Sequence, residues 1–175
     1  MKSDVAPVVM YVVVMGVAGC GKSAVGQRIA SQLNLPLIEG DDFHPAGSIA
    51  KMQQGVALTD ADRVDWLRTL GSELAGRTKG AVLTCSALKA DYRQTLRQFV
   101  SPLHFVHLAI TQAESLRRVG SRPGHFYPPS LVASQFEALQ DPSKEPNVSV
   151  LDGVMPLDEI AAQAVGRLVD SPMRN

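Results

Sequence analysis

One eight-residue loop constrains the fold of this chain more than any other feature, because a strand precedes it and a helix follows it. Residues 16–23 read Gly-Val-Ala-Gly-Cys-Gly-Lys-Ser and fit the pattern G-x-x-x-x-G-K-[ST]. Residues 8–15 form a short apolar run rich in valine, which is typical of a central parallel strand covered on both faces. Residues 23–33 carry apolar side chains at helical spacing. The sequence therefore predicts a strand–loop–helix unit at the start of a parallel sheet.

The rest of the chain continues this alternation of strands and helices. Short apolar runs predict four more strands, at residues 35–38, 81–85, 104–110 and 147–151. Amphipathic spacing predicts helices at residues 49–54, 60–76, 91–99, 112–119, 130–139 and 157–169, with Asp60 as the cap of the second of these. The pattern predicts an α/β fold with three α/β/α layers, a parallel five-stranded sheet and one domain over residues 1–175.

The loop at residues 16–23 has the residues that binding of a nucleoside triphosphate requires. Its glycines allow backbone angles that let main-chain N–H groups surround phosphate oxygens. Lys22 can reach the β and γ phosphates of ATP, and the Ser23 hydroxyl can bind the Mg²⁺ that accompanies the nucleotide. The flanking strand and helix favour this P-loop interpretation over a glycine-rich turn that binds nothing. The predicted ATP-binding residues are Gly16, Val17, Ala18, Gly19, Cys20, Gly21, Lys22 and Ser23.

Charge, hydropathy and cysteine content exclude several other classes of protein. The 175 residues include 17 lysines and arginines and 17 aspartates and glutamates, so the net charge of zero gives no general reason to bind nucleic acid or anionic membranes. The apolar run at residues 8–15 is too short to span a bilayer. Cys20 and Cys85 make no disulfide framework, which favours a reducing, cytoplasmic location. We interpret Cys20 as a small loop residue rather than a nucleophile, because no histidine stands close in sequence.

Three features favour a small-molecule kinase among P-loop proteins. The chain is short, and it has no Asn-Lys-x-Asp motif for reading guanine. Arg118 and Arg122 lie four residues apart beside a loop rich in glycine and proline, a spacing that places both on one helix face. We predict a small mobile lid at about residues 118–130, from which both arginines close over the phosphates and stabilise the transferring group. The alternative is a solvated basic surface.

A second group of candidate residues follows the second predicted strand. Asp41 is expected at the carboxyl end of a parallel strand, beside the ligand crevice, where it could orient or deprotonate an acceptor hydroxyl. The alternative for Asp41 is a helix cap, and His44 could contact substrate or be structural. The third predicted strand ends without an aspartate, so the usual metal-binding carboxylate is missing there. Ser86 or Asp41 is the expected replacement.

Several longer segments resemble the P-loop gluconokinase family, in its order and at its spacing. They are Gly-Asp-Asp-Phe-His-Pro at residues 40–45, Lys-Met-Gln-Gln-Gly at 51–55, Leu-Thr-Asp-Ala-Asp-Arg at 58–63, Trp-Leu at 66–67, Cys-Ser-Ala-Leu-Lys at 85–89, Tyr-Arg at 92–93, Gly-His-Phe at 124–126 and Ser-Gln-Phe-Glu at 134–137. The resemblance implies a nucleoside-kinase-like fold and phosphorylation of D-gluconate to 6-phosphogluconate, with ATP and Mg²⁺, by a homodimer.

The resemblance also implies where the acceptor binds. It indicates a substrate-binding segment at about residues 41–78. The candidate acceptor contacts are Asp41, His44, Lys51, Arg63, Lys89 and Arg93. The alternatives are a charge network at a helix start for Arg63 and a surface position for Arg93. Gluconate carries a carboxylate and several hydroxyls, and the sequence leaves open which cation meets the carboxylate. Two rivals also stay open: a kinase for another acceptor, such as shikimate or a nucleoside monophosphate, and a nucleotide-binding module without transfer activity. We expect no nucleic-acid or membrane partner.

Overall fold

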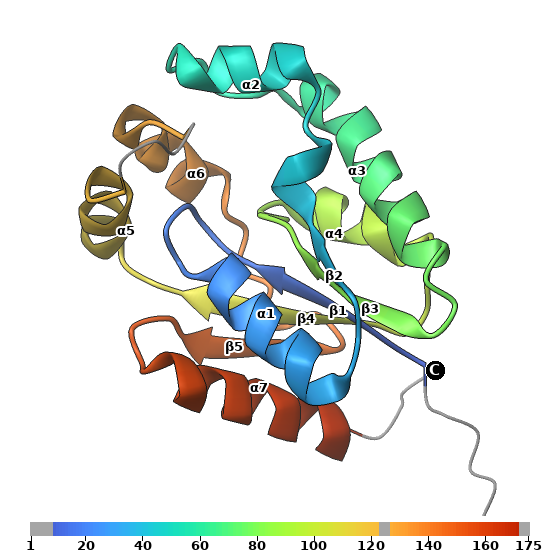
Figure 1. The fold of residues 1–175 in the computed structure, drawn as a ribbon. Helices are drawn as coiled ribbons and strands as arrows, with labels where there is room; N and C mark the ends of the chain where they lie inside the picture. The colour runs from blue at the N-terminus through green and yellow to red at the C-terminus, as the bar shows by residue number, and fades with distance from the viewer. Residues whose placement is uncertain (1–8, 123–126, 172–175) are drawn as a thin grey trace, which may run out of the picture.

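A five-stranded sheet, parallel at every strand pairing, forms the centre of the computed structural model, which describes residues 9–122 and 127–171. The strands are β1 (Met10–Met15), β2 (Leu37–Glu39), β3 (Gly80–Thr84), β4 (Leu103–Ala109) and β5 (Val148–Asp152). Their spatial order is β2-β3-β1-β4-β5 (Figure 1). The predicted parallel sheet is confirmed, and the strand bounds differ by a few residues because an apolar run does not mark where strand pairing begins.

The register of the sheet aligns buried residues on its three central strands. Val13 of β1 lies beside Leu83 of β3 and Phe105 of β4, and all three side chains are buried. These strands are covered on both faces of the sheet, which explains why their sequences are continuous apolar runs. Because parallel strands end at the same edge of a sheet, the loops that follow β1, β2 and β3 meet there.

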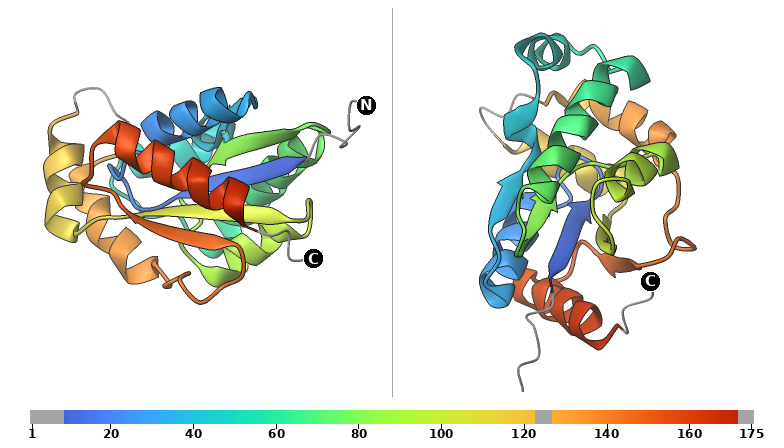
Figure 2. Two further views of the ribbon diagram at one scale, coloured as in Figure 1. Left: turned by 90° about the horizontal axis from the view of Figure 1, so that it is seen from below. Right: turned by 90° about the vertical axis from the view of Figure 1, so that its right-hand side faces the viewer.

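Helices cover both faces of the sheet and make the three predicted layers. Helices α1 (Lys22–Leu33) and α7 (Leu157–Asp170) lie side by side on one face, and α3 (Asp60–Ala75) and α4 (Ala90–Arg97) pack on the other (Figures 1 and 2). The first core includes Ile29 of α1, and the second includes Leu70 of α3. The three-layer α/β/α prediction is confirmed.

A third apolar cluster lies beyond the carboxyl ends of the strands. It is formed by Ala18, Met52, Val119, Tyr127, Leu131 and Val132. The elements that gather there are α2 (Ala46–Gln53), α5 (Gln112–Gly120), α6 (Val132–Ala138) and two 3₁₀ turns, η1 (Gly40–Phe43) and η2 (Pro129–Leu131) (Figure 1). The loop after β1 therefore packs, through Ala18, in a cluster with three short helices that come from distant parts of the sequence.

Two local predictions are wrong. Asp60 does not cap α3, because Thr59 is the N-cap: its side chain accepts from the Asp62 N–H at 3.2 Å, and the Asp62 carboxylate accepts from the Thr59 N–H at 2.9 Å. Helix α5 ends at Gly120, so Arg118 and Arg122 do not share a helix face. In the described part of the chain, no helix is both long enough and apolar enough to cross a membrane.

Candidate active site

The loop between β1 and α1 has the conformation that its glycines permit. Gly21 has a φ of 101° and is the N-cap of α1, an arrangement that a side chain at this position would strain. The helix thus begins at Lys22 and directs the positive end of its dipole at the loop. The Lys22 ammonium donates to the carbonyls of Gly16 and Val17, each at 3.1 Å, and so lies over the loop.

Side chains from α5 and α6 hold this loop in place. The Ala18 N–H donates to the Gln135 side-chain oxygen at 2.6 Å, and the Ser115 hydroxyl donates to the Ala18 carbonyl at 2.7 Å. Both hydrogen bonds are buried. The Arg118 guanidinium donates to the Gly19 carbonyl at 3.2 Å and to the Gly153 carbonyl at 3.0 Å. The loop is therefore connected to the helices that precede and follow the predicted lid.

A cluster of oxygen atoms lies beside the start of α1. The Glu39 carboxylate accepts from the Ser23 hydroxyl at 3.0 Å and from the Thr84 hydroxyl at 2.6 Å. Hydroxyl and carboxylate oxygens are the ligands that Mg²⁺ prefers, so the residues present fit a magnesium ion carried by a nucleotide. Sequence reasoning missed Glu39, because it searched for this carboxylate at the end of the third strand. The signal was an acidic residue at the end of the second strand, which pairs with the third.

Close contact between β2 and β3 positions the residues that follow Glu39. A Cβ atom on Gly40 would lie 2.1 Å from the Thr84 carbonyl oxygen, so only glycine fits there. The Trp66 indole N–H donates to the Gly40 carbonyl at 2.9 Å. The His44 ring stacks on Trp66, with 4.1 Å between centroids, and its Nε2 lies 3.5 Å from Asp41 Oδ1. Asp41 and His44 are thus held at the edge of the sheet where the P-loop also lies.

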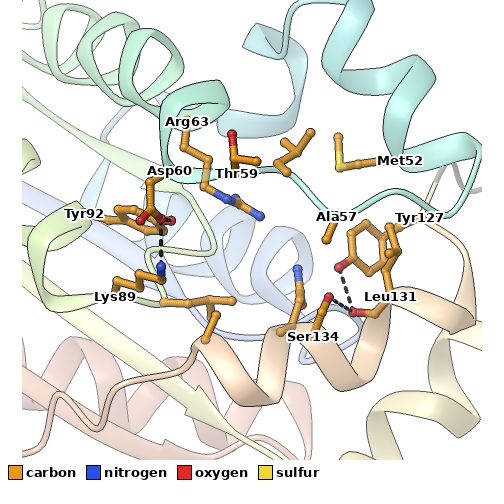
Figure 3. A pocket seen from close by; sticks show the side chains of 14 residues that line it. Met52, Ala57, Thr59, Asp60, Arg63, Lys89, Tyr92, Tyr127, Leu131 and Ser134 are labelled. Carbon is orange, nitrogen blue, oxygen red and sulfur yellow. Dashed lines mark hydrogen bonds and ion pairs between the residues drawn. The ribbon is translucent and has the colours of Figure 1, made fainter.

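Two adjoining cavities open at this edge of the sheet. The first, which we call the P-loop cavity, is bordered by Lys22, Ser23, Asp41, His44, Ser86 and Arg122, among others. The second, which we call the acceptor-side cavity, has a volume of about 340 Å³. Its polar lining consists of Thr59, Asp60, Arg63, Lys89, Tyr92, Tyr127, Ser134 and Gln135 (Figure 3). The two cavities share Met52, Arg63, Tyr127 and Gln135, so together they form one site with two compartments.

Hydrogen bonds from side chains lower the pKa of two carboxyls in the first turn of α3, Asp60 and Asp62. Lys89 Nζ donates to Asp60 Oδ1 at 2.8 Å, and the Tyr92 hydroxyl donates to the same oxygen. These contacts lower the pKa of the Asp60 carboxyl, while burial, followed by the bond to Asp60, raises the pKa of the Tyr92 hydroxyl. A hydrogen bond from Lys51 lowers the pKa of the Asp62 carboxyl to about 2. Both carboxyls are therefore ionised at neutral pH.

The structure brings most of the predicted site residues to these cavities, but not all of them. Lys51 lines neither cavity, and its ammonium pairs with Asp62 at 2.9 Å on the neighbouring helix. Arg118 also lines neither, because its guanidinium is bound to loop carbonyls and to Glu114. Arg122 does border the P-loop cavity. Part of the predicted lid, including the Gly-His-Phe motif at 124–126, lies outside the described residues.

Arg93 has a different role from the predicted one. Its side chain is 0% exposed, and its guanidinium is fully engaged by protein groups. It donates to the Ala87 and Leu88 carbonyls at 2.9 Å, to the Gln140 carbonyl at 3.1 Å and to the Glu145 carboxylate. A buried and saturated guanidinium cannot contact substrate, so the prediction of an acceptor contact at Arg93 is wrong. The residue instead holds the β3–α4 loop against the segment before β5.

Comparison with known proteins identifies relatives of the chain. A search with protein-family models found no match. The gluconokinase of Gluconobacter oxydans is 42% identical over 146 residues, which cover 82% of this chain and 82% of that protein. The thermoresistant gluconokinase of Escherichia coli is 38% identical over 157 residues, which cover 87% of this chain and 90% of that protein. In each comparison, the similarity therefore extends over most of this chain and most of the other protein.

Solved structures give the same result. The crystal structure of a gluconokinase from Sinorhizobium meliloti 1021 has a TM-score of 0.84 and 43% sequence identity, and the match covers 92% of each chain. The shikimate kinase of Aquifex aeolicus matches with a TM-score of 0.61 and 18% identity, over 91% of this chain and 96% of that one, which shows a common fold alone. With a formed P-loop, this sheet order and identity sustained over most of its length, the chain belongs to the P-loop gluconokinase family.

Proposed function

We propose that this chain transfers the γ-phosphoryl group of ATP to the primary hydroxyl of D-gluconate, giving 6-phosphogluconate and ADP. The observation that carries the proposal is the pair of adjoining cavities, one bordered by the P-loop and the other by polar and cationic side chains. Phosphoryl transfer requires mainly that donor and acceptor be held in line in a positively charged environment. A triphosphate in the first cavity and a polyhydroxylated acid in the second would meet this requirement.

Four charged side chains of the P-loop cavity, and one that acts from outside it, have roles in this proposal. Lys22 and the loop N–H groups bind the triphosphate, and Arg122, which also borders the cavity, adds positive charge. Asp41 orients the acceptor hydroxyl and accepts its proton as the oxygen attacks the γ phosphorus and ADP leaves. Arg63, on the border between the two cavities, contacts both the acceptor and the group in transfer. Arg118 acts through the P-loop, which it holds from the side of α5.

We also propose that a magnesium ion binds together with the nucleotide. When bound with the nucleotide, Mg²⁺ neutralises charge on the β and γ phosphates. Ser23 and Glu39 would hold it, and Thr84 keeps the Glu39 carboxylate oriented through its hydroxyl. Ser86, which borders the P-loop cavity, is left to contact the acceptor or the phosphates.

Domain roles and assembly complete the proposal. Residues 41–78 would form the acceptor side of a single domain, and residues 118–130 the lid over the nucleotide. The homodimer implied by the family resemblance is proposed for this chain as well. Sedimentation velocity at several protein concentrations would check the assembly, because a mass of 18.8 kDa for the monomer is easily distinguished from twice that value.

A coupled ADP-release assay with a panel of acceptors tests the reaction. Gluconate, shikimate, glucose and nucleoside monophosphates are each added with ATP and Mg²⁺. Gluconate-dependent ADP release supports the proposal, and release that depends on shikimate or a nucleotide instead identifies a kinase with another acceptor. Tight binding of ATP without stimulation by any acceptor would identify a nucleotide-binding module.

A further inference from the structure

We propose that Lys89 and Tyr92 bind the carboxylate of the acceptor, and that Asp60 occupies this site in the free protein as an internal substitute for that carboxylate. The inference rests on the proposed function, because it assumes an acceptor with a hydroxyl at one end and a carboxylate at the other. It goes further by assigning the cation that the sequence left open and by giving Asp60 a competitive role.

The charge of the acceptor-side cavity is the first observation. Among the described residues that line it, Arg63 and Lys89 are cations and Asp60 is the single carboxylate. The hydrogen bonds from Lys89 and Tyr92 lower the pKa of Asp60, so the lining carries one surplus positive charge. The Arg63 guanidinium projects into the cavity (Figure 3), with its Cζ 5.8 Å from the centroid of the Tyr92 ring. A cavity of this charge fits a monoanion.

The geometry around Asp60 is the second observation. Lys89 Nζ, at 2.8 Å, and the Tyr92 hydroxyl converge on one oxygen, Asp60 Oδ1. Two donors that meet on one oxygen form a ready-made carboxylate site. The Asp60 side chain is 65% exposed, and exposed ion pairs contribute little to stability, so another carboxylate can replace this one. When the acceptor carboxylate has displaced it, the negative charge of Asp60 is still stabilised, because Asp60 is the first residue of α3 and lies at the positive end of the helix dipole.

The position of this contact within the cavity is the third observation. Met52, Arg63, Tyr127 and Gln135 border both cavities and therefore mark the end of the acceptor-side cavity nearest the P-loop. Asp60, Lys89 and Tyr92 border only the acceptor-side cavity and lie across it from Met52 and Tyr127 (Figure 3). An extended acid with its terminal hydroxyl toward the P-loop thus directs its carboxylate to Lys89 and Tyr92. Arg63 then faces the middle of the acceptor.

Three variants and one uncharged analogue test the inference. D-glucitol has the carbon chain of gluconate with a hydroxymethyl group in place of the carboxylate, so its inhibition constant reports binding without the anion. Lys89→Met should raise the KM for gluconate at least about tenfold and leave the glucitol inhibition constant within about twofold. Tyr92→Phe should act in the same direction with a smaller change. Asp60→Asn should lower the KM for gluconate about two- to fivefold, with the KM for ATP unchanged, because the competing charge is gone.

Glu73→Gln is the matched control, since it neutralises a partly exposed acid of α3 that pairs with Arg77 and lines neither cavity. Melting temperatures of all variants identify effects on folding. If Asp60→Asn raises the gluconate KM, or if Lys89→Met weakens gluconate and glucitol equally, Asp60 and Lys89 form only a structural pair and the inference is overturned. If the wild type phosphorylates gluconate normally and the variants have the same KM for gluconate as the wild type, the inference is overturned but the proposed function stands. A wild-type chain without gluconate-dependent ADP release overturns the proposed function and the inference with it.

Discussion

Asp41 borders the P-loop cavity, and among the described residues it is the single carboxylate that does so. Asp41→Asn keeps the shape of the side chain but removes the proton acceptor. We expect kcat to fall by about 10²- to 10⁴-fold, the usual contribution of a general base, while the dissociation constant of ATP changes by less than about threefold. Steady-state kinetics and calorimetric titration with ATP measure the two quantities separately.

Asp42→Asn is the control for this variant, because Asp42 is the exposed neighbour in the same turn and lines neither cavity. Its kinetics should match those of the wild type. An unchanged kcat in Asp41→Asn would mean that Asp41 serves only to position His44, whose Nε2 lies 3.5 Å from it.

Glu39 provides a separate test of the magnesium site. Glu39→Gln can still accept hydrogen bonds from Ser23 and Thr84, so the local structure should persist. Loss of the negative charge should raise the Mg²⁺ concentration for half-maximal activity by about tenfold or more. A titration of activity with Mg²⁺ at fixed ATP measures this shift. An unchanged titration curve would show that Glu39 only accepts hydrogen bonds from the two hydroxyls and does not bind Mg²⁺.

Single residues also show where sequence reasoning reaches its limit. Lys22 and Ser23 could be assigned, because the P-loop is a continuous segment whose roles follow from spacing along the chain. Glu39 could not, because its place beside Thr84 depends on the pairing of β2 with β3. Arg93 was assigned to the substrate although it lies between Tyr92 and Leu96 on the buried face of α4. Its position on an apolar stripe was the available signal.

At the scale of elements, Arg93 connects the α4 helix to the β3–α4 loop and to the segment before β5, in addition to the apolar packing of α4 in the second core. This side chain bonds to the carbonyls of the β3–α4 loop, where Ala87 has an unfavourable φ of 46°, and to Glu145. Arg93→Met would remove the donor of the Ala87 and Gln140 carbonyls, whereas Leu88 would keep the Gln140 N–H and Glu145 would keep Arg97. We expect a loss of about 2–4 kcal/mol in the free energy of unfolding, because each buried carbonyl left without a donor costs about 1–3 kcal/mol. Urea unfolding measures this loss.

Arg77→Met is the control, because it breaks an exposed pair with Glu73 one helical turn away. Its unfolding free energy should change by about 1 kcal/mol or less. If Arg93→Met were as stable as this control, the buried guanidinium would contribute no more than a surface charge, and our account of the β3–α4 loop would be wrong.

At the scale of the whole molecule, the sheet could be predicted and the site could be predicted only in part. Alternating valine-rich runs and amphipathic helices are local signals, and they gave the parallel sheet and its layers. The acceptor-side cavity is formed by residues 52–63, 88–92 and 127–138, which are far apart in sequence. Its shape depends on how α3, α4 and α6 pack, and no local pattern encodes that packing.

Two buried histidines of β4 make the stability of the whole fold depend on pH. His104 and His107 are 7% and 6% exposed, and burial lowers the pKa of each imidazole; the charge of Arg93 lowers that of His107 further. In the unfolded chain the same groups titrate near pH 6.5. As the pH falls below that value, the unfolded state binds protons that the folded state resists. The free energy of unfolding should therefore decrease, by at most about 1.4 kcal/mol per pH unit for each histidine.

Urea unfolding at pH 7.5, 6.5 and 5.5 tests this dependence, with His107→Leu as the comparison. Removing one imidazole should flatten the curve in this range, since its uptake of a proton on unfolding is lost. The carboxyls of Asp62 and Glu114, whose pKa values are lowered to about 2 by their cationic partners, contribute stability that is lost only as the pH falls below about 4.5. A decrease that begins near pH 6.5 thus belongs to the histidines. An unfolding free energy that stays constant from pH 7.5 to 5.5 would show that β4 accommodates charged imidazoles without cost.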